Sequence, residues 1–484
     1  MSVALAERAA GTQTATRRPL CVDVEGALLR SSPFVEAWLA LLRATPGTAF
    51  GALMQFVRGG TRAVATYVAQ HTKFDATALA YDERVIERLR QARVQGRLIV
   101  LITKLPEAWA AQIGEYVGGI DTVLQSDESP SAGESSPISV LTAHFGANAF
   151  DFVGSKDAPA WAAARTGIFS AADVRAAPTR RLNVASAETI ERLQPDRRAW
   201  LHQLRVHQWV KNLLIFVPLI AGRRIGDLHM LQAALAAFLA FGCVASASYI
   251  LNDLLDLPHD RTHPSKRRRP LAAGTISIPS AAAAMISLFA LGAGIAAALP
   301  ATLAAVLLLY CCGTLAYSFF LKRIAPLDAF TLAGLYTLRV FAGNAATGLA
   351  PSFWLLAFSI FLFLSLAMAK RHTELLRLAA AGANAVRGRG YVASDRAMVS
   401  QLGVGSGYIS VLVLTLYLNT PSASELYRRP QLLWLLCVLL LYWLSHLWLI
   451  AHRGQLDDDP VVFALRDRCS RFVALAVVIV LLLA

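Results

Sequence analysis

The sequence has little charge and no cysteine pattern typical of a metal or disulfide framework. Only 16% of its 484 residues are charged, whereas 56% are hydrophobic. Its six cysteines lie mostly in or beside apolar stretches and lack the paired spacing of a zinc site or a secreted scaffold. So apolar a composition excludes an ordinary soluble protein and places part of the chain in lipid.

A secretory signal is also missing from the beginning of the chain. The segment MSVALAERAAGTQTATRRP contains no apolar core of the necessary length, and it includes Arg17 and Arg18. We therefore expect residues 1–17 to be a disordered tail and the domain that follows to stay in the cytoplasm.

Basic residues outnumber acidic ones, 46 to 32, which gives a net charge of +14. They gather beside hydrophobic stretches rather than along one soluble segment. This distribution favours a role in membrane topology and in phosphate binding, and it argues against nucleic acid as a partner.

Short apolar strands alternate with helical segments in the first part of the chain. The candidate strands PLCVDV, RLIVLIT and AFDFVG occupy 19–24, 97–103 and 149–154. Such alternation favours a parallel sheet. The expected organisation is an α/β domain over 18–185, a charged linker over 186–204 and a transmembrane domain over 205–484.

Apolar stretches long enough, or nearly long enough, to cross a bilayer follow one another after residue 211. We expect about nine, at 212–222, 231–251, 280–299, 301–320, 327–348, 353–369, 402–419, 431–450 and 470–484. Alternate loops are rich in Lys and Arg, which predicts that these loops and the N-terminal domain face the cytoplasm of a cell whose inner membrane holds the bundle.

The segment NDLLDLPHD at 252–260 is the strongest chemical motif. On a continuing helix, Asn252, Asp256 and Asp260 share one face and Asp253 lies beside them. Clustered oxygen ligands suit Mg²⁺ carried by a diphosphate. We predict that these four residues bind the metal and that the three aspartates are catalytic; a solvated acidic helix end is the alternative.

A basic run, HPSKRRRPLAAG, follows within a few residues. Lys266, Arg267 and Arg269 are candidate ligands for phosphate oxygens that the metal leaves uncovered. Ordinary anchoring at the cytoplasmic surface would explain each of these charges equally well.

Together, N-D-x-x-D-x-x-x-D and R-P-L-x-x-G resemble the first aspartate-rich motif of UbiA-type prenyltransferases, and the resemblance extends over about residues 200–484. The segments LRVHQWVKNLLIFVPL, YSFFLK, LYTLRVFAG and DDDPVVFALRDR resemble the decaprenyl-phosphate phosphoribosyltransferase branch. The resemblance implies an all-α polytopic membrane bundle that transfers 5-phosphoribose from phosphoribosyl pyrophosphate to a polyprenyl phosphate with Mg²⁺.

One departure from the general family supports this branch. Where most UbiA-type enzymes carry a second Asp-x-x-x-Asp motif, this chain reads AKRHTELL, with Lys370, Arg371 and Glu374. Cations suit a phosphorylated acceptor better than a neutral aromatic ring. Prenyl transfer from a polyprenyl diphosphate to an aromatic acceptor is the enzymatic alternative, and a lipid-binding scaffold is the non-enzymatic one. Oligomers are possible.

Polar residues within or beside the apolar stretches complete the candidate substrate site. Tyr336 and Arg339 are three residues apart on one helix face, and a charge at such depth normally faces a cavity or a partner. Lys211, Tyr317 and Lys322 are expected near the same surface, with interfacial anchoring as the alternative. The acidic run at 457–459 precedes Pro460 and is typical of a helix N-terminus, with metal binding as the alternative.

The N-terminal domain resembles haloacid dehalogenase-like phosphatases over about residues 18–170. CVDVEGALL matches their nucleophile strand at Asp23, but Glu25 replaces the second aspartate. Thr103 is a candidate phosphate-binding hydroxyl, the usual lysine is not found around 130–142, and Ser155 stands where the loop acid is expected. We expect a degenerate domain with a structural or docking role, and transfer by the membrane part without it.

Overall fold

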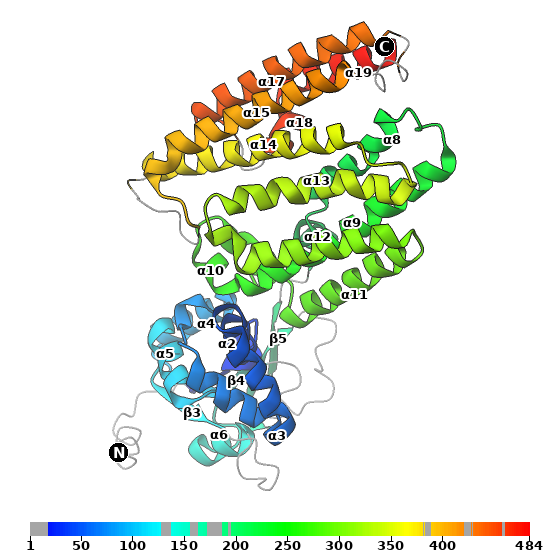
Figure 1. Cartoon of the computed structure of the whole chain (residues 1–484). Coiled ribbons are helices and arrows are strands. Elements are labelled where there is room, and N and C mark those ends of the chain that lie inside the picture. The colour runs from blue at the N-terminus through cyan, green and yellow to red at the C-terminus, as the bar shows by residue number, and fades with distance from the viewer. Residues whose placement is uncertain are drawn as a thin grey trace. The chain divides into compact units, whose positions relative to one another are not determined.

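The computed structural model describes residues 18–126, 137–154, 163–171, 186–191, 195–380, 382, 389–420, 427, 429–456 and 460–484 (Figure 1). The expected tail at 1–17, Ser155 and the acidic run at 457–459 lie outside these ranges. Contacts divide the chain into two units. The first comprises residues 1–203 together with 251–282, and the second comprises 204–250 together with 283–484.

A parallel sheet forms the centre of the first unit. In the described residues its order is β3-β2-β1-β4-β5-β6, with every pairing parallel. The strands are β1 Leu20–Asp23, β2 Ile99–Thr103, β3 Thr122–Gln125, β4 Asp151–Gly154, β5 Thr166–Ala171 and β6 Ser186–Glu191. The predicted parallel sheet is confirmed, and the three predicted strands are β1, β2 and β4. Strands β1, β2 and β4 are buried almost throughout, which explains their nearly continuous apolar sequences.

Helices, several of them amphipathic, also belong to the first unit. They are α2 Pro33–Ala44, α3 Pro46–His71, α4 Glu83–Val94, α5 Glu107–Val117, α6 Pro137–Phe145, α7 Arg197–Leu204 and α10 Leu257–Thr262. In α4, Val85, Ile86 and Leu89 are buried at helical spacing, and the Asp82 side chain accepts a hydrogen bond from the Arg84 amide at the N-terminus. These residues pack in one apolar cluster with residues of β1 and β2.

Long apolar helices make up the second unit, where α13, α14, α15 and α17 lie side by side (Figure 1). Helices α9 and α11 cross between the two units. The helices are α8 Val217–Ala221, α9 Leu228–Leu255, α11 Ile278–Ala297, α12 Ala301–Phe319, α13 Leu327–Thr347, α14 Phe353–Ala380, α15 Arg396–Leu418, α17 Trp434–His452, α18 Pro460–Arg466 and α19 Arg468–Leu483.

Six helices in the described part of the chain are long and apolar enough to cross a membrane, so this is a multi-pass membrane protein. The other three predicted spans are helical but fall short of that standard. The segment Val206–Ala221 and helix α19 are short, and α13 carries Asp328 and Arg339. Nine crossings therefore stay a prediction.

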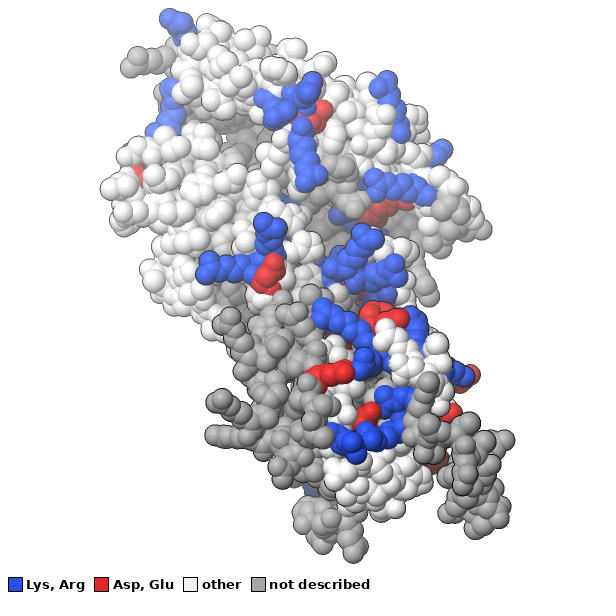
Figure 2. All heavy atoms as spheres, turned by 180° about the vertical axis from the view of Figure 1, so that it is seen from behind, with Lys and Arg blue, Asp and Glu red and all other residues white. Residues whose placement is uncertain are grey.

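The surface of these helices is largely apolar. Figure 2 shows broad areas without Lys, Arg, Asp or Glu over the helical part of the molecule. Leu308 and Leu309 on α12 are 66% and 57% exposed. Water would oppose such exposure, whereas lipid tails solvate it.

A glycine permits close packing inside the second unit. A Cβ atom at Gly343 of α13 would lie 2.1 Å from the Ile215 carbonyl oxygen. Small residues allow this approach of backbones in membrane bundles. The approach brings the segment Val206–Phe216, which includes Lys211 and Asn212, against α13.

Candidate functional site

The aspartate-rich segment lies where two consecutive helices meet. Helix α9 ends at Leu255, α10 begins at Leu257, and Asp256 joins them. Helical hydrogen bonds continue through the junction, from the Asp256 amide to the Asn252 carbonyl and from the Asp260 amide to the Asp256 carbonyl, each 2.9 Å. Because Pro258 has no amide hydrogen, the regular helix cannot run through it unbroken.

Asp253 and Asp260 converge on one cation. Arg269 Nη1 lies 3.1 Å from Asp253 Oδ1 and 2.5 Å from Asp260 Oδ2. The two aspartates are 4% and 1% exposed, so their charges need a cation. Residues seven apart return to the same helix face, which explains why Asp260 joins Asp253. The common face of Asn252, Asp256 and Asp260 stays a prediction, and Asp253, which was expected beside it, pairs with Asp260 through Arg269.

Asp256 has different surroundings from the other two aspartates. Its side chain is 28% exposed, and its Oδ1 atom lies 2.8 Å from Arg43 Nη1 on α2. Asn252 is partly buried, and Arg267 is exposed. The four predicted metal ligands thus comprise a buried pair and two more accessible side chains.

The buried pair and its neighbour Gln203 offer oxygens of the kind that suits Mg²⁺. Asp260 Oδ1 and Gln203 Oε1 are buried without a hydrogen-bond partner. Gln203 also donates a hydrogen bond to Asp253 Oδ2 at 2.9 Å, and Lys266 Nζ lies 3.8 Å from Asp260 Oδ1. Carboxylate and carboxamide oxygens are the ligands that Mg²⁺ prefers. No motif marks Gln203, which lies 50 residues before its partner.

The second unit contains a buried cluster of ions between α13 and α14. Arg371 Nε lies 2.7 Å from Asp328 Oδ2, and the Arg371 guanidinium also pairs with Glu374. Asp328 accepts hydrogen bonds from Tyr391 (2.5 Å) and Arg389 (3.2 Å). Arg389 and Tyr391, which sequence reasoning missed, come from the segment between α14 and α15.

This cluster gives different surroundings to the three candidate site residues of AKRHTELL, which are Lys370, Arg371 and Glu374. The Arg371 guanidinium is engaged by two carboxylates, and its Nη2 atom donates to Tyr317 at 3.4 Å. Lys370 is partly buried. The structure thus joins Arg371, Glu374 and Tyr317, and it places Lys322 in the turn between α12 and α13.

Arg339 is buried among neutral groups. Its Nε donates to Asn212 Oδ1 (2.9 Å), its Nη1 to the Leu335 carbonyl (2.7 Å) and its Nη2 to the Tyr310 hydroxyl (2.8 Å). The guanidinium also lies 5.4 Å from the centre of the Tyr336 ring, and Lys211 Nζ lies 5.7 Å from the same ring. The predicted set of Lys211, Tyr336 and Arg339 is therefore brought together, around an aromatic face that attracts cations.

An apolar groove of about 710 Å³ lies between α12, α13 and α14. Leu309, Leu338, Phe341 and Phe361 are among its lining residues. Its walls suit a hydrocarbon chain.

The carboxyl ends of β1 and β2 bring Asp23 and Glu25 together with Thr103. Glu25 accepts hydrogen bonds from the Thr103 hydroxyl (3.0 Å) and from the Lys104 amide (2.9 Å). Burial raises the pKa of both Asp23 and Glu25 above the ordinary carboxyl range. The Thr103 hydroxyl, which was predicted to bind phosphate, therefore donates a hydrogen bond to Glu25.

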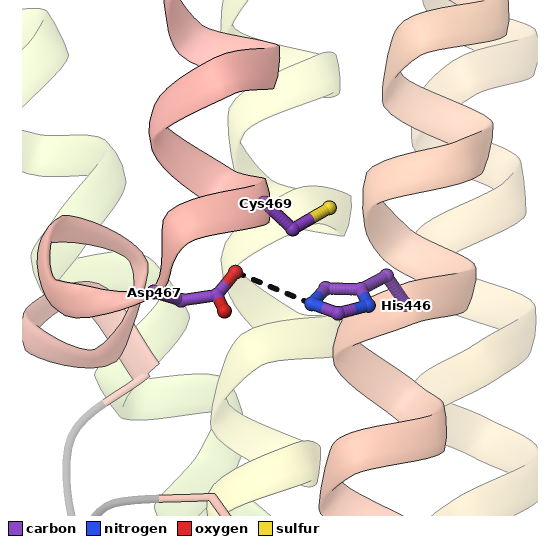
Figure 3. Close-up of side chains that lie close together, drawn as sticks. All are labelled: His446, Asp467 and Cys469. Carbon is purple, nitrogen blue, oxygen red and sulfur yellow. Dashed lines mark hydrogen bonds and ion pairs between the residues drawn. The ribbon is translucent and has the colours of Figure 1, made fainter.

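A further cluster of possible metal ligands joins α17 to the beginning of α19 (Figure 3). His446 Nε2 lies 3.2 Å from Asp467 Oδ2, and Cys469 lies beside them. The same Asp467 oxygen accepts hydrogen bonds from the Ser470 amide and hydroxyl, at 2.7 and 2.8 Å. Burial alone would raise the pKa of Asp467, but these hydrogen bonds lower it. Asp467 is thus explained as the N-cap of α19.

Comparison with known proteins identifies the class. Residues 214–478 match the UbiA prenyltransferase family, which covers more than half of the chain. The chain belongs to this family of membrane transferases.

The chain is also similar to individual proteins. The uncharacterized protein y4nM of Sinorhizobium fredii is 36% identical over 94% of this chain and 89% of its own length, and the nodulation protein NoeC of Azorhizobium caulinodans is 38% identical over 55% and 86%. The decaprenyl-phosphate phosphoribosyltransferase of Mycobacterium tuberculosis is 36% identical over 36% of this chain and 58% of its own length. A solved UbiA homolog from Archaeoglobus fulgidus, bound to DMAPP and Mg²⁺, aligns with 59% of this chain and all of that one, at 18% identity and a TM-score of 0.45.

Proposed function

We propose that this protein transfers 5-phosphoribose from phosphoribosyl pyrophosphate to a polyprenyl phosphate in the membrane. The observation that carries the proposal is the convergence of buried Asp253 and Asp260 on Arg269, with two buried oxygens, Asp260 Oδ1 and Gln203 Oε1, that accept no hydrogen bond. The identity to the decaprenyl-phosphate phosphoribosyltransferase of M. tuberculosis supports the choice of substrates.

In this reaction a phosphate oxygen of the lipid forms a bond with the anomeric carbon of ribose. The bond from that carbon to pyrophosphate breaks, and the electron pair leaves with the pyrophosphate. Mg²⁺ held by Asn252, Asp253, Asp256 and Asp260 would supply positive charge for the departing group. Lys266, Arg267 and Arg269 bind phosphate oxygens that the metal leaves uncovered.

The second unit contains the other residues that were predicted to bind substrate. We assign Lys211, Tyr336, Arg339 and Lys370 to substrate binding. Arg371 and Glu374 act with Tyr317 by fixing the local backbone through their buried ion pairs, and Lys322 serves as a surface cation. The apolar groove between α12, α13 and α14 suits the hydrocarbon tail of the acceptor.

Prenyl transfer to an aromatic acceptor is the second candidate, because the family to which the chain belongs is one of prenyltransferases. The lack of a second aspartate pair in AKRHTELL favours phosphoribosyl transfer over it.

One assay separates the two reactions. Purified full-length protein is incubated with a polyprenyl phosphate and labelled phosphoribosyl pyrophosphate, or with a polyprenyl diphosphate and 4-hydroxybenzoate, each with and without Mg²⁺. We expect labelled lipid only in the first mixture with Mg²⁺. A prenylated aromatic product would favour the second candidate, and no product from either would favour a lipid-binding scaffold.

We also propose the organisation and orientation of the chain. The α/β part over 18–185 and the predicted linker over 186–204, whose residues Ser186–Glu191 form strand β6 of the sheet, lie in the cytoplasm. The transmembrane part over 205–484 lies in the inner membrane. The basic loops between the predicted spans support this orientation. The resemblance of the α/β part to haloacid dehalogenase-like phosphatases also stays a proposal.

A further inference from the structure

Arg261, the residue after Asp260, joins the aspartate-rich segment to the N-terminal domain. Its side chain is 6% exposed and pairs with Glu36 of α2, which is 5% exposed. Its guanidinium also donates to the Ala78 carbonyl (2.9 Å) and to the Ala272 carbonyl (3.0 Å). Because the buried Arg261 guanidinium has these partners on both segments, it restricts movement of the backbone around residue 261.

Two arginines of the N-terminal domain, Arg30 and Arg43, contact the region that follows α9. Arg43 Nη1 lies 2.8 Å from Asp256 Oδ1, and Arg30 Nη1 donates to the Ala273 carbonyl at 3.0 Å. Arg30 Nε is in turn 3.4 Å from Asp82 Oδ2. Gly274 has a φ of +69°, and a Cβ atom there would come within 2.9 Å of the Arg30 side chain. The contacts thus extend from Asp256 in the aspartate-rich segment to Gly274 at the end of the basic run.

We propose that the N-terminal domain positions the metal-binding segment of the transferase through Arg30, Glu36 and Arg43. All of these contacts lie within the first unit, which unites residues 1–203 with 251–282. The consequence for catalysis rests on the proposed function, whereas the positioning itself does not. The domain is then required for transfer, contrary to the expectation from sequence.

The chemistry explains why positioning would matter. Arg269 must reach both Asp253 and Asp260, and its backbone lies between two anchored points, Arg261 and Ala273. A ligand set fixed before the metal arrives does not lose conformational freedom on binding it. Loss of the Glu36 carboxylate would leave the Arg261 guanidinium buried without its counter-ion and free the segment to move.

The test compares full-length wild type with Glu36→Gln and Arg43→Ala. The matched control is Arg90→Ala, because Arg90 forms an exposed ion pair with Glu87 on the same domain. Hydrogen–deuterium exchange of the amides at 256–274 is measured first, alone and with Mg²⁺ plus inorganic pyrophosphate. Phosphoribosyl transfer is then measured against Mg²⁺ concentration.

We expect exchange at 256–274 to accelerate at least 10-fold in Glu36→Gln, with weaker protection by Mg²⁺ and pyrophosphate. The Mg²⁺ concentration for half-maximal transfer should rise at least 5-fold in Glu36→Gln and in Arg43→Ala. Arg90→Ala should leave both the exchange and this concentration unchanged. Unchanged exchange in Glu36→Gln would contradict the proposal that these contacts hold the segment in place. Faster exchange with an unchanged Mg²⁺ dependence would show that the contacts stabilise the fold without positioning the metal ligands. A wild type inactive with phosphoribosyl pyrophosphate would refute the proposed function, while exchange and its protection would still decide the positioning.

Discussion

Arg371 of α14 and Asp328 of α13 form a 2.7 Å ion pair in which the side chains are 1% and 0% exposed. Two helices of a membrane bundle are thereby joined by charges that neither lipid nor water reaches. Such a pair fixes the relative position of its helices, because breaking it leaves the buried Arg371 charge with Glu374 as its remaining carboxylate partner.

We expect Asp328→Ala to lower the free energy of unfolding by about 3–5 kcal/mol, since Arg371 keeps its charge without this partner. Thermal unfolding in detergent would measure the change. The double variant Asp328→Ala with Arg371→Met is expected to lose less than the single variant. Equal stability of the wild type and Asp328→Ala would contradict a structural role for the pair.

Gly343→Ala should destabilise the helical unit, because the added Cβ would lie 2.1 Å from the Ile215 carbonyl oxygen. Gly334→Ala is the control in the same helix, since nothing lies within 4 Å of a Cβ there. Alanine favours a helix over glycine by about 0.8–1.0 kcal/mol, so the control should be neutral or slightly more stable. A lower unfolding temperature for the control than for Gly343→Ala would refute the packing argument.

The Asp23 carboxyl should make the stability of the N-terminal domain depend on pH. Its pKa is raised by burial, so the folded state holds the proton more tightly than the unfolded state does. The stability linked to this group is present below the unfolded pKa and is lost as pH rises through the higher folded pKa. Asp23→Asn should therefore stabilise the domain at neutral pH, with the difference vanishing in acid.

The same variant tests the domain for phosphatase activity. We expect Asp23→Asn to leave phosphoribosyl transfer unchanged and neither protein to release phosphate from the lipid-linked phosphoribose product. Release by the wild type that is absent from Asp23→Asn would show a working phosphatase.

Asp253→Ala should reduce transfer more than about 100-fold, because it removes both a metal ligand and a partner of Arg269. Asp256→Ala should also be inactive at limiting Mg²⁺. Folding is checked by the unfolding temperature, and near-normal turnover in Asp253→Ala would reject the metal assignment.

Cysteine labelling tests the orientation. In a variant without native cysteines, a cysteine at Ser265 should be protected from an impermeant reagent added outside intact cells, and one at Ser352 should react. The reverse pattern would place the aspartate-rich segment outside the cytoplasm.

The sequence predicted the family, the parallel sheet and the aspartate-rich motif, because these depend on local patterns. Strand β3 was missed, since Thr122–Gln125 is four residues long and largely half-buried, without a strong apolar alternation. The long-range partners were out of reach for a different reason. Tyr391 and Asp328 are 63 residues apart, and nothing in either local sequence indicates the other.

The same difficulty explains the candidate site. The sequence shows that Asp253 and Asp260 are seven residues apart. It does not show that Arg269 folds back to contact both of them, which is what makes them a pair. Gln203 and Arg43 come from segments that carry no motif, so only the folded chain identifies them as neighbours of the aspartates.

The separation of Glu36 from Arg261 has a consequence for biosynthesis. The two residues are 225 positions apart, and the residues at 204–250 between them belong to the other unit. At a synthesis rate of about 5–20 residues per second, Glu36 leaves the ribosome roughly 10–45 s before Arg261 does. During this interval a hydrophobic helix is inserted while the Glu36 carboxylate in the nascent N-terminal domain still lacks Arg261. We therefore expect a chaperone to bind the domain in this interval.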